Sequence, residues 1–199
     1  MLKNIVFDLG NVLVEFKPID YMLRMGFESA IATELNKLIF ANPMWNEFDR
    51  GTITIESYCE YLKEKHPQFS AEIDRVFGSD WVSNMFILDS NVSRFLEEMS
   101  HKYRIFVLSN VSEYVFEYIQ TLGFWKHVSG GTYSYLIRAC KPEEEIYEAF
   151  FRENHLNPVE CLFLDDKPEN IEAAKKIGMK GIVFKKNLEE VLETIRKLG

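Results

Sequence analysis

The sequence of 199 residues has few cysteines and no long apolar run, and both features narrow the class of protein. Its three cysteines, Cys59, Cys140 and Cys161, are odd in number, widely spaced and form no CxxC pair. They fit reduced thiols better than a disulfide framework. No apolar stretch approaches the roughly 20 residues of a membrane span, and Asp8 interrupts the first apolar stretch too early for a signal peptide. We therefore expect a soluble, cytoplasmic protein with no membrane partner.

Basic clusters and several common enzyme motifs are also missing. The net charge is −8, and the basic runs are short pairs such as Lys175-Lys176, which argues against a nucleic-acid partner. The four histidines have no zinc-type spacing. The patterns GxSxG, Walker A and GxGxxG do not occur. These absences disfavour a zinc protein, a serine hydrolase and a P-loop enzyme.

Strand and helix patterns alternate along most of the chain. Five segments read as buried strands: NIVFDL (4–9), RIFVLSN (104–110), HVSGG (127–131), CLFLDD (161–166) and KGIVFK (180–185). Those around Val6, Val107 and Phe163 are continuous apolar runs, which is typical of parallel strands covered on both faces. Helical patterns lie between the strands, at 91–103, 112–122, 142–154, 168–177 and 188–198. This alternation predicts an α/β fold with a doubly wound, Rossmann-like parallel sheet.

One interval is too long for a simple connection between strands. About 95 residues separate Asp8 from Arg104, whereas a crossover needs roughly a dozen to 30. The excess carries helical patterns at 31–40 and 55–65. We therefore predict that residues 1–14 and 90–199 form the core, and that residues 15–89 form a small helical cap inserted after the first strand.

Polar residues gather at the predicted carboxyl ends of the strands, where ligands bind in open parallel sheets. The first and the fourth predicted strands end in aspartates, and the second strand ends in a serine and an asparagine. One lysine lies between the third strand and its helix. These residues are Asp8, Ser109, Asn110, Lys141, Asp165 and Asp166. Because they follow different strands of one sheet, we expect them to converge on one edge.

The chemistry of this set points to phosphoryl transfer. Three clustered carboxylates repel each other unless a cation lies among them, and carboxylate and carbonyl oxygens suit a hard ion such as Mg²⁺. Mg²⁺, a lysine and small hydrogen-bond donors around a nucleophilic carboxylate can transfer a phosphoryl group. We expect Gly10 to allow a sharp turn after Asp8 and to leave a carbonyl free for the metal.

The order of these motifs resembles the haloacid dehalogenase-like hydrolase superfamily. Asp8 in FDLGNVLVEF matches the first motif and its nucleophile, and Ser109 in FVLSN matches the second. Lys141 in CKPEEEIY matches the third motif. The pair Asp165-Asp166 in LFLDDKPENIEAAKKIG matches the fourth, and the insertion lies where the family has its helical cap.

The resemblance implies a phosphoric monoester hydrolase that acts on a small phosphate ester through an aspartyl-phosphate. It implies that Asp8 and Lys141 are catalytic and that Ser109, Asn110 and Lys141 bind the substrate phosphate. It places Mg²⁺ on the following residues: Asp8, Gly10, Asp165 and Asp166. Both a monomer and a homodimer remain compatible with the sequence.

The chain departs from the family pattern two positions after the nucleophile. Family phosphatases usually carry a second aspartate there, which acts as acid and base, but this chain has Gly10. A bacterial subgroup that resembles this chain, related to glucose-1-phosphate phosphatases, also carries glycine. An anomeric sugar phosphate needs less acid help, so a sugar phosphate is one candidate substrate. Glu15 could replace the acid or be a hinge residue, and Arg138 stands where relatives often have glycine.

Two other readings stay open. A 2-haloacid dehalogenase also has an aspartate nucleophile without the second acid, but it needs no metal, and its fourth motif usually lacks the acidic pair. A non-catalytic binding protein on the same scaffold would explain Gly10. The pair Asp165-Asp166 favours the Mg²⁺-dependent phosphatase over the dehalogenase, because an unpaired acid pair beside Asp8 is costly without a cation. A panel of phosphate esters would separate the binding protein from the two enzymes.

Overall fold

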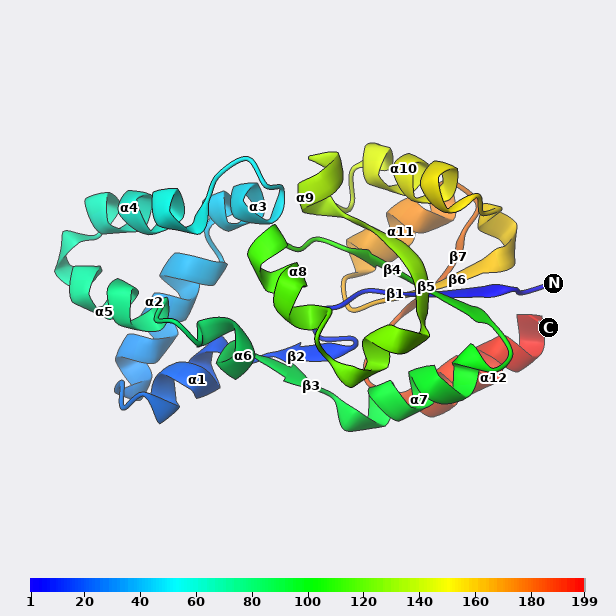
Figure 1. The fold of residues 1–199 in the computed structure, drawn as a ribbon, viewed down its shortest axis with the longest axis horizontal. Coiled ribbons are helices and arrows are strands. Elements are labelled where there is room, and N and C mark those ends of the chain that lie inside the picture. Colours follow the sequence, from blue (N-terminus) through cyan, green and yellow to red (C-terminus); the bar gives the residue numbers. More distant parts are fainter. Residues whose placement is uncertain (199) are drawn as a thin grey trace.

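The computed structural model describes residues 1–198, and its main element is a parallel sheet with strand order β5-β4-β1-β6-β7 (Figure 1). The strands are β1 (Asn4–Phe7), β4 (Arg104–Ser109), β5 (Val128–Tyr133), β6 (Cys161–Asp165) and β7 (Lys180–Val183). All four neighbouring pairs are parallel. The five predicted strands and the doubly wound α/β fold are thereby confirmed.

Alternating side chains on each strand pack against helices on opposite faces of the sheet. Val6 and Phe163 belong to the apolar cluster that includes residues of α10 and α11. Ile5 and Phe7 belong to the larger cluster with residues of α7 and α12. Because both faces are covered, the strands are apolar without a polar alternate, as the sequence pattern requires. The helices of this part are α7 (Ser90–Ser100), α8 (Glu113–Ile119), α9 (Ser134–Ile137), α10 (Glu144–Asn154), α11 (Pro168–Lys176) and α12 (Leu188–Leu198).

Local start signals explain most of these helices. Ser112 accepts a hydrogen bond from the Val115 amide at the start of α8, and Pro168 occupies the first turn of α11. The helix predicted from residue 142 begins instead at Glu144. Its preceding residue, Glu143, closes a turn onto the Cys140 carbonyl, so the proline lies before the helix and not in its first turn.

The insertion is helical and is joined to the sheet domain by a two-stranded antiparallel ribbon, β2 (Val14–Phe16) with β3 (Phe86–Leu88). Its helices lie beyond the carboxyl ends of the sheet strands (Figure 1). They pack around aromatic side chains. The sequence pattern identified the two longest helices but missed the ribbon, because three-residue strands have too short a pattern. The helices are α1 (Pro18–Arg24), α2 (Ser29–Phe40), α3 (Pro43–Asp49), α4 (Ile55–Lys65), α5 (Ser70–Val76) and α6 (Trp81–Met85).

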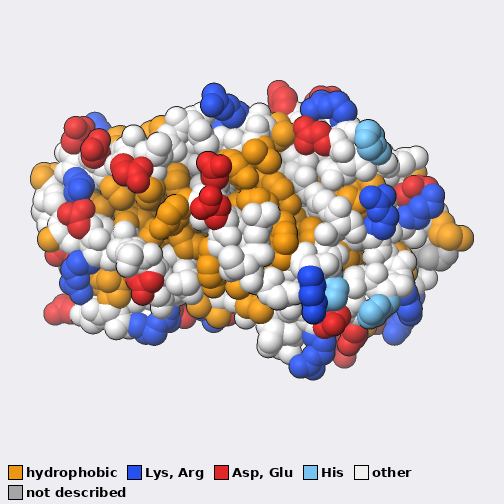
Figure 2. All heavy atoms as spheres, in the orientation of Figure 1, with side chains coloured by type: hydrophobic (Ala, Val, Ile, Leu, Met, Phe, Trp, Pro, Cys, Tyr) orange, Lys and Arg blue, Asp and Glu red, His pale blue; other side chains and the backbone are white. Residues whose placement is uncertain are grey.

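The distribution of surface charges and the state of the cysteines agree with the sequence composition. Basic side chains on the face drawn in Figure 2 are scattered among acidic ones, and hydrophobic side chains gather over the insertion and its junction with the sheet domain. Among residues 1–198, no helix combines the length and apolarity that a membrane crossing needs. Cys59, Cys140 and Cys161 are free thiols, and Cys140 and Cys161 are buried.

Candidate active site

The carboxyl edge of the sheet brings the predicted residues, except the buried Asp165, to the lining of one cavity of about 250 Å³. Asp8 follows β1 directly, and its amide donates to the Leu164 carbonyl of β6 at 2.9 Å. Ser109 is the last residue of β4 and Asp165 the last of β6. The sheet register, which pairs Phe7 with both Val107 and Leu164, therefore sets these side chains next to one another.

Lys141 lies at the centre of the charged groups. Its Nζ is 2.8 Å from Asp8 Oδ1 and 2.6 Å from Asp165 Oδ2, and it also donates to the Leu108 carbonyl at 2.9 Å. The side chain is 1% exposed. A solvated surface lysine would make none of these contacts, so Lys141 is an internal cation shared by two carboxylates.

Asp165 is saturated by donors from the protein. Besides Lys141, the Lys167 amide donates to Asp165 Oδ1 at 2.8 Å, and Asn170 Nδ2 lies 3.0 Å from both carboxylate oxygens. The Asp165 side chain is fully buried. These bonds fix its orientation and leave it little capacity to accept a further ligand.

Asp166 differs from its neighbour because it is only partly buried and lines the cavity. Asn11 Nδ2 donates to Asp166 Oδ2 at 3.1 Å. Asp8, Asp165 and Asp166 each place one carboxylate oxygen within 4.8 Å of the others. This all-oxygen set suits a hard divalent cation such as Mg²⁺, and the charge of such an ion would relieve the repulsion among the three acids.

The pKa values of the central pair reflect burial opposed by charge pairing. Burial raises the pKa of Asp8 to about 6; the Lys141 ammonium and the Ser109 hydroxyl act against this shift, and Asp165 adds to it. Burial by itself would lower the pKa of Lys141, but Asp8 and Asp165 outweigh it and raise that pKa above its ordinary value. Lys141 therefore stays charged between the two acids.

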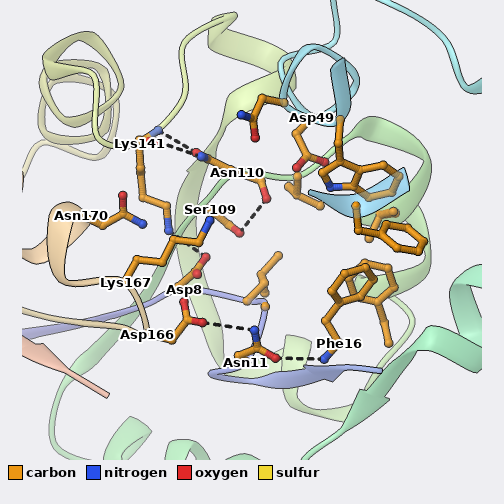
Figure 3. A pocket seen from close by; sticks show the side chains of 18 of the residues that line it. Asp8, Asn11, Phe16, Asp49, Ser109, Asn110, Lys141, Asp166, Lys167 and Asn170 are labelled. Carbon is orange, nitrogen blue, oxygen red and sulfur yellow. Dashed lines mark hydrogen bonds and ion pairs between the residues drawn. The ribbon is translucent and has the colours of Figure 1, made fainter. Parts of the chain in front are cut away.

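Asn110 supports the site through its side chain. Its Nδ2 donates to the Lys141 carbonyl at 3.0 Å, and its Oδ1 accepts from the Lys141 amide at 2.7 Å. Because the amide side chain is committed to the Lys141 backbone, it orients the lysine. Ser109 is buried and lines the cavity beside Asp8 (Figure 3).

The turn after Asp8 does not depend on glycine in the way the sequence suggested. Gly10 does not adopt a positive φ; the left-handed residue is Asn11, with φ 58°. A Cβ added to Gly10 would meet no atom within 4 Å. The part of the expectation that assigned the turn to glycine was therefore wrong: asparagine, which tolerates the left-handed region, makes the turn, and position 10 has room for a side chain.

The wall opposite the charged groups is aromatic. Phe40 packs at 5.1 Å from Phe16 and at 4.8 Å from Trp45, measured between ring centroids. Phe86 lies 4.8 Å from Phe16. All four rings line the cavity. Tyr21 and Phe48, two other aromatic residues of the insertion, are buried in the hydrophobic core and do not line it.

Asp49, which sequence reasoning missed, also lines the cavity. It is the last residue of α3 and points from that helix into the cavity that holds Asp8 and Ser109 (Figure 3). Burial raises the pKa of Asp49 to about 8, and the Asp8 carboxylate adds to the shift, whereas Lys167 and the Ser112 backbone oppose it. The residue is not fully covered because it faces the cavity.

A clamp holds the end of α3 against the sheet domain. Arg50 forms a two-point ion pair with Glu143, at 2.8 Å for Nη1–Oε2 and 2.5 Å for Nη2–Oε1. Arg50 also donates to the Arg138 carbonyl at 3.1 Å, and the Ser134 hydroxyl donates to the Asp49 carbonyl at 2.6 Å. The clamp fixes Asp49 relative to the loop that carries Lys141.

Two residues singled out in the sequence have other roles. Glu15 forms ion pairs with Lys17 and Lys186, which lower its pKa, and it does not line the cavity. It therefore cannot replace the missing acid. Arg138 has φ 57° and an exposed side chain, so the position takes the left-handed conformation that glycine adopts most easily.

A doubly wound sheet with an aspartate after its first strand, a buried lysine and an acidic pair at the same edge is compatible with a hydrolase that uses an aspartate nucleophile. The family comparison agrees, since residues 2–178 match the model of the haloacid dehalogenase-like hydrolases. The chain belongs to this family.

Its relatives include phosphatases. The chain is 24% identical to a sesquiterpene phosphatase of Aspergillus oryzae, over 99% of this chain and 97% of that protein. It is also 24% identical to the D-ribitol-5-phosphate phosphatase of Bacteroides thetaiotaomicron, over 89% of each. A haloacid dehalogenase family enzyme of B. thetaiotaomicron, solved with magnesium and inorganic phosphate, has a similar fold, with a TM-score of 0.73 and 20% identity over 94% of this chain and 96% of that one.

Proposed function

We propose that the protein is a Mg²⁺-dependent phosphatase that hydrolyses a small phosphate ester through an aspartyl-phosphate on Asp8. The observation that carries the proposal is the shared ammonium of Lys141, which holds Asp8 and Asp165 beside a cavity that Asp166 also faces. A carboxylate fixed in this way at a strand end is a suitable nucleophile for phosphorus. The names of the two curated relatives support the same reaction class.

The proposed metal ligands are the Asp8 and Asp166 carboxylates and the Gly10 carbonyl. Asp165, whose oxygens already accept from Lys141, Lys167 and Asn170, would support the metal through water or at the edge of its shell. When bound, Mg²⁺ supplies positive charge against the charge on the transferring phosphoryl group. The magnesium complex of the structural relative supports this assignment.

The other residues of the sheet edge would bind the phosphate. We propose that the Lys141 ammonium, the Ser109 hydroxyl and the backbone N–H of Asn110 bind the phosphate oxygens. The Asn110 side chain keeps Lys141 in place. Asp8 then attacks phosphorus in line, and water hydrolyses the resulting acyl phosphate. Residues 1–14 and 90–199 form the catalytic core in this proposal, and residues 15–89 form the cap.

The cap would select the substrate. Its aromatic wall gives the carbon part of an ester an apolar surface, and the sheet edge gives its phosphate a charged one. Sugar phosphates are the first candidates, because the first motif resembles that of glucose-1-phosphate phosphatases and one relative is named for ribitol 5-phosphate. An isoprenoid or aryl phosphate fits the aromatic wall and belongs in the same test.

The test is phosphate release from a panel of anomeric sugar phosphates, sugar-alcohol phosphates, aryl phosphates and isoprenoid phosphates. Release with Mg²⁺ that stops with EDTA is the expected result, and the best ester names the substrate class. If no ester reacts, the phosphatase proposal is wrong. Chloride release from 2-chloropropionate would then identify a dehalogenase, and no release of either ion would favour a binding protein.

A further inference from the structure

The proposed reaction lacks a proton donor in the place where the family usually has one. An alcohol leaving a phosphate ester needs a proton, and position 10 is glycine. The ionisable side chains that line the cavity are Asp8, Asp49, Lys141, Asp166 and Lys167. Asp8 is the nucleophile in the proposal above, Asp166 holds the metal, and Lys141 is engaged by two carboxylates. Asp49 is the remaining carboxyl group.

We propose that Asp49 is the general acid and base of the reaction, supplied by the inserted helices instead of the loop after Asp8. This inference rests on the proposed phosphatase function. Asp49 enters the cavity from α3 and points toward the side where Asp8 and Ser109 lie (Figure 3). The contacts of its own backbone and of Arg50 with the sheet domain hold it there.

The surroundings of Asp49 keep it protonated at neutral pH. The charged groups that act on it are Lys167 and Asp8, and the buried Cys140 and Tyr58 are titratable groups near enough to interact with its charge. Burial dominates this environment, and the pKa of about 8 lets the carboxyl group carry a proton near pH 7. A donor whose pKa lies near the working pH is suited to give and regain a proton.

The proton transfers balance over the two steps. In the first, an Asp8 oxygen bonds to phosphorus, the bond from phosphorus to the ester oxygen breaks, and that oxygen takes the Asp49 proton and leaves as the alcohol. In the second, Asp49 as carboxylate takes a proton from water while the water oxygen bonds to phosphorus. The bond between Asp8 and phosphorus breaks, its electron pair returns to the Asp8 carboxylate, and phosphate leaves.

This assignment changes the argument about the substrate. Glycine at position 10 favours an anomeric phosphate only if the enzyme has no other acid. With Asp49 as donor, esters of ordinary alcohols are equally open to hydrolysis. The choice of substrate is then limited by how well the alcohol part fits the aromatic wall, and not by the acidity of the leaving alcohol.

The first test compares Asp49→Asn with wild type on an alkyl phosphate from the panel and on p-nitrophenyl phosphate. Nitrophenolate leaves without a proton, so the variant should release one equivalent per enzyme in a burst and then turn over slowly as the acyl phosphate persists. Turnover of the alkyl ester should fall about 100-fold or more, with no burst of alcohol. Glu47→Gln is the matched control, because Glu47 lies on the same helix but bonds Thr52 and Arg50 outside the cavity.

A second variant tests whether the lost function is proton transfer. Position 10 has space for a side chain, so Gly10→Asp can place an acid where the family usually has it. In the Asp49→Asn background, this change should recover alkyl ester turnover at least tenfold. A merely structural role of Asp49 would not be rescued by an acid on a different loop.

Each outcome distinguishes the two proposals. A wild-type protein that releases phosphate from no ester overturns the phosphatase and, with it, the role of Asp49. An active wild type with an Asp49→Asn variant that releases no burst of nitrophenolate, or that keeps the wild-type turnover of both esters, overturns the role of Asp49 alone. If the variant does not fold, the wild-type ratio of alkyl to aryl turnover decides: it should fall as pH rises above about 8, and a constant ratio contradicts the inference.

Discussion

The two walls of the cavity are built on different principles. On the sheet side, charged groups are fixed by several partners each, as Lys141 is by Asp8, Asp165 and the Leu108 carbonyl. On the inserted side, aromatic rings contact mainly one another, and Asp49 is the acid among them. The comparison suggests that attack on phosphorus depends on the rigid wall, and that substrate choice and proton transfer depend on the wall that the insertion supplies.

Removing the nucleophile should have the largest effect. Asp8→Asn should lower phosphate release by at least about 10⁴-fold, because asparagine cannot form the acyl phosphate. Circular dichroism and the thermal midpoint should stay close to wild type, since Asn has the same shape and Lys141 keeps Asp165 as a partner. Measurable turnover in this variant would refute the mechanism on the sheet side.

Removing the shared cation should affect both activity and folding. Lys141→Ala leaves two buried carboxylates without their ammonium, so we expect a loss of about 3 kcal/mol in the free energy of unfolding at pH 7 and of roughly 10²–10³-fold in kcat/KM. Urea unfolding and steady-state kinetics measure the two effects. Normal kinetics would mean that Lys141 is only structural.

Asp49, on the inserted side of the cavity, should make the free energy of unfolding depend on pH. Its pKa in the folded protein, about 8, lies above its ordinary value of 3.8, so folding favours the protonated form. The stability it contributes is complete below pH 4 and is lost as pH rises toward 8. Asp49→Asn, which does not titrate, should therefore gain stability relative to wild type over this range, by at most about 1.4 kcal/mol per pH unit. Urea unfolding in EDTA from pH 5 to 8 measures the difference, and a constant difference would contradict the raised pKa of this acid.

A change in the aromatic wall should have the smallest effect and should act on binding. Phe40→Ala removes a ring that packs on Phe16 and Trp45, and we expect a rise in KM of about tenfold for the preferred ester. Inhibition by inorganic phosphate, which touches only the charged wall, should not change. Parallel loss of phosphate inhibition would show that the two walls are not independent.

The sequence predicted the sheet side better than the inserted side for a physical reason. Asp8, Ser109 and Asp165 end strands whose apolar runs are continuous, and parallel strands necessarily bring their carboxyl ends to one edge. Lys141 has no such pattern by itself, and only its place among the motifs separated it from a surface lysine. The role of Gly10 was misread because φ depends on the exact turn, which Asn11 makes.

Asp49 could not be found from local patterns. It lies in the segment FDRG at the end of a seven-residue helix, and nothing in that segment indicates a neighbour some 40 positions earlier in the chain. Its position comes from tertiary contacts, namely the Arg50–Glu143 pair and the Ser134 hydroxyl. The adjacent Arg50 and Gly51, with φ 74°, are compatible with a constrained turn but identify no partner.

The β2–β3 ribbon has a mechanical consequence. Both chain connections to the insertion run side by side in one antiparallel ladder, so the insertion is attached along a single line that can act as a hinge. A rotation about that line would break the Arg50–Glu143 pair and carry Asp49 away from Asp8. The proton donor would then move away together with the insertion. In this open state the protein could admit an ester and water but could not hydrolyse the ester.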